Sequence, residues 1–268
     1  LGYKMSKSKG NVIDPIQIMD TYGADALRYW AANTKLGEDT RYQEKDLKNG
    51  QRLTTKLWNA AKLTFEMVKD YDGKKPKKME MIDSWMLSKL QKVIKECTNY
   101  FDAYEFSKAR TALEVFFWHT LCDNYLEIVK HRFYSENHDA KKSAQYVLSQ
   151  SLSTVLKLLA PLMPYITEEL YQIGYAKQEK RKSIHLTSWP DADEKLVDEK
   201  IEKKGDVFVE LLSKIRKFKS DHGKSLKTDV DVTLERKDLD LLKGMEEDFK
   251  AAAKIRHLDD GAFSVEFI

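Results

Sequence analysis

Apolar side chains recur every three or four residues through most of the first 220 positions, which is the spacing of amphipathic helices. Short helices are predicted over 16–22 and 24–31, with a glycine between them. In the second of these, Leu27, Trp30 and Ala31 form the apolar face.

Longer apolar stripes predict a bundle of amphipathic helices joined by short links. Sparse punctuation, with 11 Gly and 5 Pro, favours long helices over many short strands. Ser84 and Asp139 are interpreted as N-caps, because their side-chain oxygens can accept hydrogen bonds from the free N–H groups of a first turn. The bundle helices are expected over 45–69, 85–101 and 106–133, from Asp139 to the residue before Pro161, and from Pro164 to about Ile173.

The pattern changes near the C-terminus. After a helix over 199–220, Val230, Val232 and Leu234 alternate with polar residues, which indicates a strand. A helix over 238–252 and a hairpin over 255–267 complete the expected tail.

The fold class is therefore mainly α, a helical bundle with a small C-terminal α+β unit. We expect residues 1–43 to end a preceding core, 44–176 to form the bundle, 177–198 to be a linker and 199–268 to form the α+β unit.

Composition limits the functional classes. Lys and Arg number 46 against 43 Asp and Glu, so a polyanionic partner would need charge concentrated in one place. The cysteines Cys97 and Cys122 stand far apart, which predicts buried thiols, no metal site and a reducing, cytoplasmic location. No run of about 18 apolar residues predicts a membrane span. Because the chain does not begin with Met, we expect a fragment of a larger protein. We also expect the protein to be a monomer.

Three lysines, two serines and a glycine stand together in the segment Lys4–Asn11, KMSKSKGN. Mobile charges, hydroxyls and an unhindered backbone are what a phosphate chain requires, and Lys7, together with Lys4, could stabilise a leaving pyrophosphate. The Gly-x₄-Gly-Lys-Ser/Thr spacing of a Walker loop is absent. By composition alone, a basic leader sequence is the alternative.

The order of these residues resembles a known family. KMSKSKGN followed by VIDP and YGADALRYW is similar to the signature loop of the class I aminoacyl-tRNA synthetases. GEDTRYQEKDL (37–47), KLWNAAK (56–62) and LAPLMPYITEELYQ (159–172) resemble the core end and anticodon-binding bundle of its valine, isoleucine and leucine subgroup. The resemblance covers most of residues 1–220. It is greatest to valine enzymes of the archaeal-like kind, with isoleucine and leucine as alternatives.

The resemblance implies a ligase that attaches valine to its tRNA with ATP, assisted by Mg in the full-length enzyme. The ATP-binding loop would be Lys4, Met5, Ser6, Lys7 and Ser8, with Lys7 and Lys4 as catalytic lysines. The family's HIGH-type histidine loop is not among these residues, so we expect this chain alone to be inactive and to hold no bound cofactor. Valine and ATP would act through the missing catalytic domain.

The bundle would bind tRNA by stacking splayed bases and contacting phosphates. The candidates on the first long helix are Arg52, Lys56, Trp58, Asn59 and Lys62, although core packing also accounts for Trp58. The segment 214–219, KIRKFK, fits a tRNA-backbone contact and an ordinary amphipathic helix equally well. The basic run 130–132 needs no RNA, since cations favour a helix C-terminus. A non-catalytic tRNA-binding module and a protein-interaction scaffold remain the alternatives.

Overall fold

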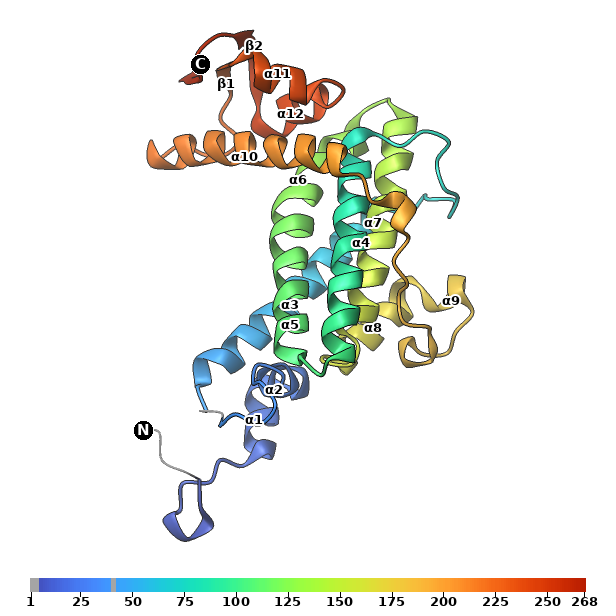
Figure 1. The fold of residues 1–268 in the computed structure, drawn as a ribbon, viewed down its shortest axis with the longest axis vertical. Coiled ribbons are helices and arrows are strands. Elements are labelled where there is room, and N and C mark those ends of the chain that lie inside the picture. Colours follow the sequence, from blue (N-terminus) through green and yellow to red (C-terminus); the bar gives the residue numbers. More distant parts are fainter. Residues whose placement is uncertain (1–4, 40–41) are drawn as a thin grey trace. The chain divides into compact units, whose positions relative to one another are not determined.

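The structure is a computed structural model and describes residues 5–39 and 42–268. Helices dominate it, as the apolar pattern predicts (Figure 1). In this part of the chain no helix is both long and apolar enough to cross a membrane. The helices are α1 (Pro15–Tyr22), α2 (Ala24–Ala31), α3 (Glu44–Met67), α4 (Met81–Asp102), α5 (Phe106–Val115), α6 (Leu126–Val129), α7 (His138–Leu159), α8 (Pro164–Gly174), α9 (Ala176–Glu179), α10 (Glu199–Asp221), α11 (Arg236–Leu242) and α12 (Glu246–Ala253).

Local sequence explains where α1 begins and ends. Asp14 accepts a hydrogen bond from the Ile16 N–H at 2.9 Å, and Pro15 occupies the first turn, where its missing N–H costs nothing. Gly23 follows with a φ of 89°, a conformation that side-chain-bearing residues rarely adopt. The two predicted N-terminal helices, separated by this glycine, are confirmed.

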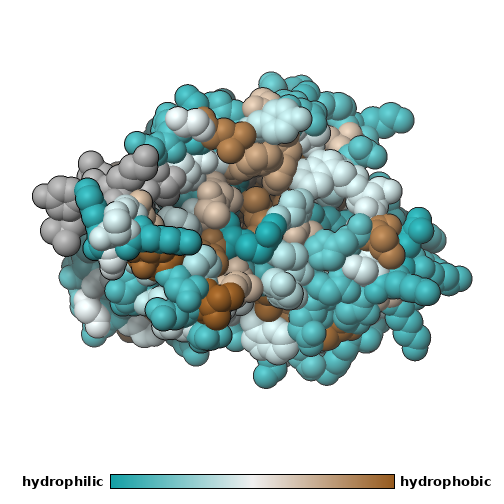
Figure 2. Space-filling view, turned by 90° about the horizontal axis from the view of Figure 1, so that it is seen from below, coloured by the Kyte–Doolittle hydropathy of each residue, from teal (hydrophilic) through white to brown (hydrophobic). Residues whose placement is uncertain are grey.

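The predicted stripes of the long helices are buried. Polar side chains cover their outer faces, so the surface in Figure 2 is largely hydrophilic with separated apolar patches. Phe65, Val68 and Phe101, at the ends of their stripes, are half-buried. The stripe residues buried in the interior include Leu53, Leu57 and Ala61 of α3, Met86, Leu90, Val93, Ile94 and Cys97 of α4, and Val147, Leu148, Leu152, Val155, Leu158 and Leu159 of α7.

Both predicted N-caps are wrong. α4 begins at Met81, and Ser84 lies inside it with its hydroxyl donating to the Glu80 carbonyl at 3.2 Å. Burial of Ile82 and its neighbours extends this helix upstream, so packing outweighs the local cap signal. α7 is capped by Asn137, whose Oδ1 accepts from the Ala140 N–H at 3.1 Å, not by Asp139.

The helix predicted over 106–133 changes its winding. After α5 the chain forms a π-helix at Phe116–Tyr125, then α6, then a 3-10 turn at Lys130–Tyr134. Phe116 and Leu121 are both buried and stand five residues apart. Hydrogen bonds from i to i+5 place residues at this spacing on one face, so the wider helix buries side chains that an α-helix would rotate outward.

The described chain divides into two compact units. The predicted domain boundaries at 43, 176 and 198 stay predictions. The first unit comprises the chain up to Glu66 with Val93–Val115 and Leu152–Asp191, and the second comprises Met67–Lys92, Phe116–Ser151 and Ala192–Ile268.

The segment expected to be a linker is packed in part. It contains α9 and 3-10 turns at Ile184–Leu186 and Glu194–Leu196. Within the first unit, the Trp189 indole donates to the Thr98 hydroxyl at 2.8 Å, and its ring lies 5.0 Å from that of Phe101. These contacts hold the segment against α4.

In the second unit, strands β1 (Val230–Leu234), β2 (Ile255–Asp260) and β3 (Ser264–Phe267) form a sheet of order β2-β1-β3. β1 runs parallel to β2 and antiparallel to β3. Val230, Val232 and Leu234 are buried, so the predicted alternation of β1 is confirmed.

The tail departs from prediction at two points. The helix expected over 238–252 is split into α11 and α12 at Gly244, which has a φ of 86°. The predicted hairpin is wrong, because β1 lies between β2 and β3. Gly261 donates its N–H to the Leu234 carbonyl at 2.9 Å, and a Cβ there would lie 2.9 Å from the Thr233 methyl. The link between β2 and β3 therefore passes closely around the end of β1.

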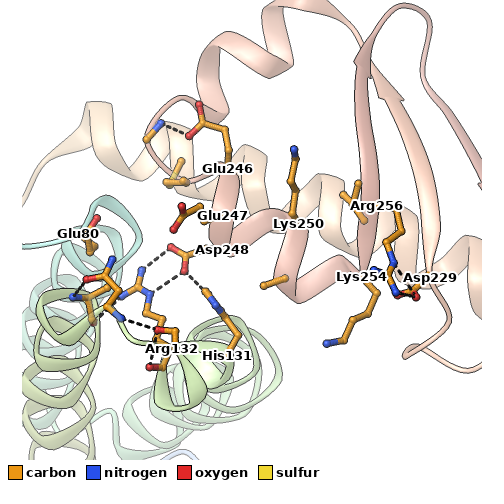
Figure 3. A pocket seen from close by; sticks show the side chains of 17 residues that line it. Glu80, His131, Arg132, Asp229, Glu246, Glu247, Asp248, Lys250, Lys254 and Arg256 are labelled. Carbon is orange, nitrogen blue, oxygen red and sulfur yellow. Dashed lines mark hydrogen bonds and ion pairs between the residues drawn. The ribbon is translucent and has the colours of Figure 1, made fainter.

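A buried ionic network connects α4, the turn after α6, and α12 (Figure 3). Arg132 donates to Asp83 at 2.8 Å and to both carboxylate oxygens of Asp248 at 2.8 and 2.5 Å. His131 bonds Asp248 at 2.7 Å, and the Tyr125 hydroxyl donates to Asp83 at 2.7 Å. The basic run 130–132 is therefore not simply a helix end favoured by the dipole.

Burial opposes ionisation of Asp248, but hydrogen bonds from His131 and Arg132 outweigh it and hold the pKa of this carboxyl below its ordinary value. The carboxylate is thus charged at neutral pH and matched to the guanidinium. Such pairs add little net stability over an apolar core, yet loss of one partner leaves an uncompensated buried charge.

Replacing Arg132 by Met should lower the free energy of unfolding by about 3–5 kcal/mol, because Asp83 and Asp248 would stay buried without their cation. Urea denaturation followed by circular dichroism measures the change. Arg236→Met is the control, since its ion pairs with Asp240 and Asp260 are exposed and such pairs contribute roughly 0–1 kcal/mol. Equal losses in the two variants would contradict this account.

Candidate nucleic-acid interface

The described part of the basic N-terminal segment forms a compact turn. Lys7–Lys9 is a single 3-10 turn, closed by the Gly10 N–H donating to the Lys7 carbonyl at 3.1 Å. Gly10 has a φ of 63°, which explains the glycine at this position. The Asn11 side chain accepts from the Ser6 N–H at 2.8 Å and joins the two ends of the turn.

The side chains of this turn are available to a ligand. The hydroxyls of Ser6 and Ser8 lie 2.6 Å apart, and Lys7 is exposed. Among the residues that the structure describes, Lys7 forms no ion pair. Met5 is also exposed, whereas Lys4 lies outside the described residues. Paired hydroxyls beside an uncommitted ammonium are the donor types that fit a phosphate chain.

The five candidate RNA contacts lie on the solvent side of α3. Trp58 has 41% of its surface exposed, so the core-packing interpretation of this residue is wrong. Asn59, Arg52 and Lys62 are exposed, and Lys56 is partly exposed. This face, which we call the α3 face, combines an aromatic ring, an amide and three cations.

The α3 face is oriented by its opposite side. Leu53, Leu57 and Ala61 are fully buried in the first unit, and Gly50 lies against the Ala26 backbone, 3.0 Å from the position that a Cβ would take. Because 3.6 residues complete a turn, burial of these positions turns 52, 59 and 62 outward. The arrangement can stack an unpaired base and contact phosphates. Contact of these residues with RNA stays a prediction.

α2 is attached to the bundle by a charged residue that the apolar pattern missed. Asp25 is buried and accepts from the N–H groups of Tyr165 and Ile166 at 3.1 and 2.7 Å. These are free donors in the first turn of α8, where the helix dipole favours an anion. Arg28 adds a hydrogen bond of 2.8 Å to the Pro161 carbonyl.

The predicted face of α2 is therefore wrong. Asp25, Ala26 and Tyr29 are the buried residues, whereas Trp30 is half-buried and Ala31 is exposed. The polar residues on the buried face of α2 bond to groups on other helices. The apolar pattern of α2 alone could therefore not identify this face. One signal for this face was present in the sequence. Arg28 and Tyr29 stand three and four residues after Asp25, and the small residue Ala26 stands beside it.

Tyr29 links α2 to α5. Its hydroxyl donates to Glu114, and the Arg110 guanidinium lies 4.4 Å from the centre of its ring. Burial raises the pKa of Tyr29 well above its ordinary value, opposed by the charge of Arg110 and supported by hydrogen bonding to Glu114. The phenol therefore stays neutral and acts as a fixed donor.

Part of the basic segment 214–219 is structural. Lys219 is 1% exposed and donates to the carbonyls of Leu226, Thr228 and Ala253 at 3.3, 2.7 and 2.6 Å. Burial lowers the pKa of this ammonium. Arg216 donates to the Asp123 carbonyl at 3.0 Å. Lys219 is therefore committed to the protein interior, whereas Arg216 is partly exposed and its contact with the tRNA backbone stays a prediction.

The thiols are not part of a site. Cys97 and Cys122 are both buried, and burial raises the pKa of Cys97 to about 12. Among residues 5–39 and 42–268, no three His, Cys, Asp or Glu side chains are grouped so that they could hold a metal ion.

Two family models match the chain. The anticodon-binding domain of tRNA ligase matches residues 83–234, more than half of the chain, and the class I tRNA synthetases (I, L, M and V) match residues 1–43. The match at 1–43 covers the basic turn, and the match at 83–234 covers most of the bundle.

Curated relatives are valine–tRNA ligases. That of Wolbachia sp. subsp. Brugia malayi is 46% identical over 84% of this chain and 26% of its own length. The Ehrlichia canis and Pyrococcus furiosus proteins are 43% and 37% identical over 92% and 96% of this chain, and over 31% and 29% of their own lengths. The chain thus spans less than a third of each of these relatives.

Solved structures share the fold. The LeuRS of Agrobacterium radiobacter K84, solved as a ternary complex with tRNA and LeuAMS, has a TM-score of 0.57 at 21% identity, over 74% of this chain and 23% of that one. Mycobacterium tuberculosis methionyl-tRNA synthetase with methionyl-adenylate has a TM-score of 0.53 at 22% identity, over 65% and 36% of the two chains.

Replacing Asp25 by Ala should lower the free energy of unfolding by about 1–3 kcal/mol, because two buried N–H groups of α8 lose a charged acceptor. Hydrogen exchange should accelerate at the amides of Tyr165 and Ile166. Asp14→Ala, which removes the exposed cap of α1, is the control and should leave these two amides protected. Unchanged exchange in the Asp25 variant would refute the capping role.

Proposed function

The chain belongs to the anticodon-binding family of class I tRNA ligases, and from this we propose that it is part of a valine–tRNA ligase. Identity of 37–46% to valine–tRNA ligases over 84–96% of this chain carries the proposal. Each of the three curated relatives is a valine–tRNA ligase, which favours valine over isoleucine and leucine. In the proposed division, residues 1–43 end the catalytic core, 44–176 bind tRNA, 177–198 connect, and 199–268 form an accessory unit.

The basic turn is the proposed ATP-binding loop. Lys4, Met5, Ser6, Lys7 and Ser8 would hold the phosphate chain. ATP, with Mg in the complete enzyme, would activate the valine carboxylate by transfer of an adenylyl group with release of pyrophosphate. A tRNA hydroxyl would then take the valyl group and release AMP. The exposure of Lys7 supports its role as the residue that stabilises charge on the departing pyrophosphate. The hydroxyls of Ser6 and Ser8 would orient the same phosphates.

The α3 face is the proposed contact with the anticodon arm of valine tRNA. Trp58 would stack on a splayed base and Asn59 would hydrogen-bond a base edge, while Arg52, Lys56 and Lys62 neutralise phosphates. Exposure of a large aromatic ring beside cations supports this assignment, because an unpaired base can stack on such a ring while the cations contact its phosphates.

Replacing Trp58 by Ala should weaken binding of valine tRNA roughly 5- to 100-fold, since base–aromatic stacking contributes about 1–3 kcal/mol. A gel shift at fixed salt measures the affinity. Tyr134→Ala removes a tyrosine that is 89% exposed and outside the α3 face, and it should bind normally.

The same assay tests the cations and the anticodon. Lys62→Ala should reduce the slope of log affinity against log salt by about 0.7–0.9, whereas Lys203→Ala on α10 should leave it unchanged. Equal affinity for valine tRNA and an anticodon variant would reject the anticodon role.

In the complete ligase, Lys7→Ala should lower the rate of pyrophosphate exchange by about 10²–10³, the usual effect of removing one transition-state donor. Lys9→Ala is the matched control, because Lys9 is exposed in the same turn. Residues 1–268 alone should show no exchange, and turnover by this chain would refute the proposal that it cannot activate an amino acid.

A further inference from the structure

A pocket of about 850 Å³ lies within the second unit, where α12 and the start of β2 approach the turn after α6 and the first turn of α7 (Figure 3). This volume is in the range of small-molecule sites. None of the residues assigned above to ATP or tRNA lines it. Its walls come from segments far apart in the sequence.

Opposite charges occupy the two ends of this pocket. Figure 3 shows Glu80, Glu246 and Glu247 at one end and Lys254 and Arg256 at the other, with Lys250 on α12 between them and nearer the cations. A ligand that complements both ends must carry an anion at one side and hydrogen-bond donors at the other.

The cations of the pocket are largely uncommitted. Lys250 lies on α12 and Lys254 is the residue that caps the C-terminus of this helix, and both are exposed. In residues 5–39 and 42–268, neither of them forms an ion pair. Arg256 is shared with Asp229, at 2.7 Å. Mobile ammonium groups on long side chains are donors that fit the oxygens of a phosphate.

Lys254 stands at a position where glycine is the less strained choice. It ends α12 in the left-handed region, with a φ of 56°, and its N–H donates to the Lys250 carbonyl. Glycine predominates at this site in other helices because it has no Cβ. A lysine here keeps a cation at the pocket despite the backbone strain.

Two of the three glutamates at the acidic end of the pocket already have partners within the protein. Glu246 accepts from the Gly244 N–H at 2.7 Å, and Glu80 lies 3.7 Å from the ammonium of exposed Lys78. Glu247 forms no ion pair among the described residues, so its oxygens are available to a donor.

The charged groups at the floor of the pocket already have hydrogen-bond partners within the protein. Arg132 and Asp248 bond each other and leave no unmatched charge for a ligand. Ligand selection therefore falls to the two charged ends, while the ionic network holds the walls in place.

We propose that this pocket binds one unstacked nucleotide of an RNA loop. Lys250 and Lys254 contact its phosphate, and Glu247 accepts from the amino group of its base. RNA loops are recognised by splaying bases into protein sites, and carboxylates pair with amino groups on base edges. This inference rests on the proposed tRNA-binding function, but it concerns residues outside the α3 face.

Binding of valine tRNA by residues 1–268, measured by gel shift over a range of salt, tests the phosphate contacts. Lys254→Gly should weaken binding about fivefold and reduce the salt slope by about 0.7, the value for one contact to a single strand. It should also keep or raise the urea midpoint, because glycine relieves the left-handed strain. Weaker binding of this variant therefore does not reflect poor folding. Lys203→Ala is the charge-matched control.

Transcripts that each lack one loop base test the base contact. One abasic position should weaken wild-type binding about tenfold, and this penalty should shrink in Glu247→Gln, whose amide oxygen is only a neutral acceptor. Glu266→Gln, on exposed β3, should keep the penalty. AMP and CMP at millimolar concentration distinguish a free nucleotide from an RNA loop: competition by either, without any abasic effect, would overturn the RNA assignment.

Wild-type affinity and salt slope in both Lys250→Ala and Lys254→Gly would overturn the proposal. If Trp58→Ala still weakened binding in that case, the tRNA-binding function would stand without this pocket. If no variant, including Trp58→Ala, changed affinity, the failure would lie in the proposed function itself.

Discussion

A guanidinium removed from water has to be matched by carboxylates, and this constraint determines how the second unit is assembled. Arg132 lies between Asp83 of α4 and Asp248 of α12, so a helix of the bundle and a helix of the α+β unit share one buried cation. Loss of this cation would leave both carboxyl groups buried without their main partner. The network also forms the floor of the charged pocket and leaves only its ends free to meet a ligand.

Elsewhere, too, a buried charge has a partner of opposite charge or a hydrogen-bond partner inside the protein. Charged residues with such partners hold the fold together, and the exposed ones can bind a ligand. Asp25 is buried because the first turn of α8 offers it two N–H donors, and Lys219 is buried because three carbonyls surround its ammonium. Because these groups are buried and already hydrogen-bonded inside the protein, they cannot contact RNA. Lys7, Lys250 and Lys254, by contrast, are exposed cations, and they are among those assigned to phosphates.

The buried residues of α2 give the basic turn its connection to the bundle within the first unit. Asp25 and Tyr29 fix α2 to α8 and α5, and α1 leads from α2 to the turn that carries Lys7. The phosphate contact proposed for this turn gains from such an anchor, since only the side chains at its tip then need to adjust. Two sequence segments of the family resemblance, YGADALRYW and LAPLMPYITEELYQ, meet at this anchor.

The sequence by itself determined the helical class, the extent of most helices, strand β1 and the identity of the basic turn, because these depend on periodicity and on residue order over short distances. Tertiary structure decided where α4 begins, which residue caps α7, where the π-helix forms and that β1 lies between β2 and β3. It also decided which charged residues are buried and which are exposed. Arg132 and Lys219 look like surface cations in any local window, and Trp58 looks like a core residue. Arg132 is buried against Asp248, 116 residues away, and Lys219 has one of its three carbonyl partners at Ala253, 34 residues away. No local pattern encodes those contacts.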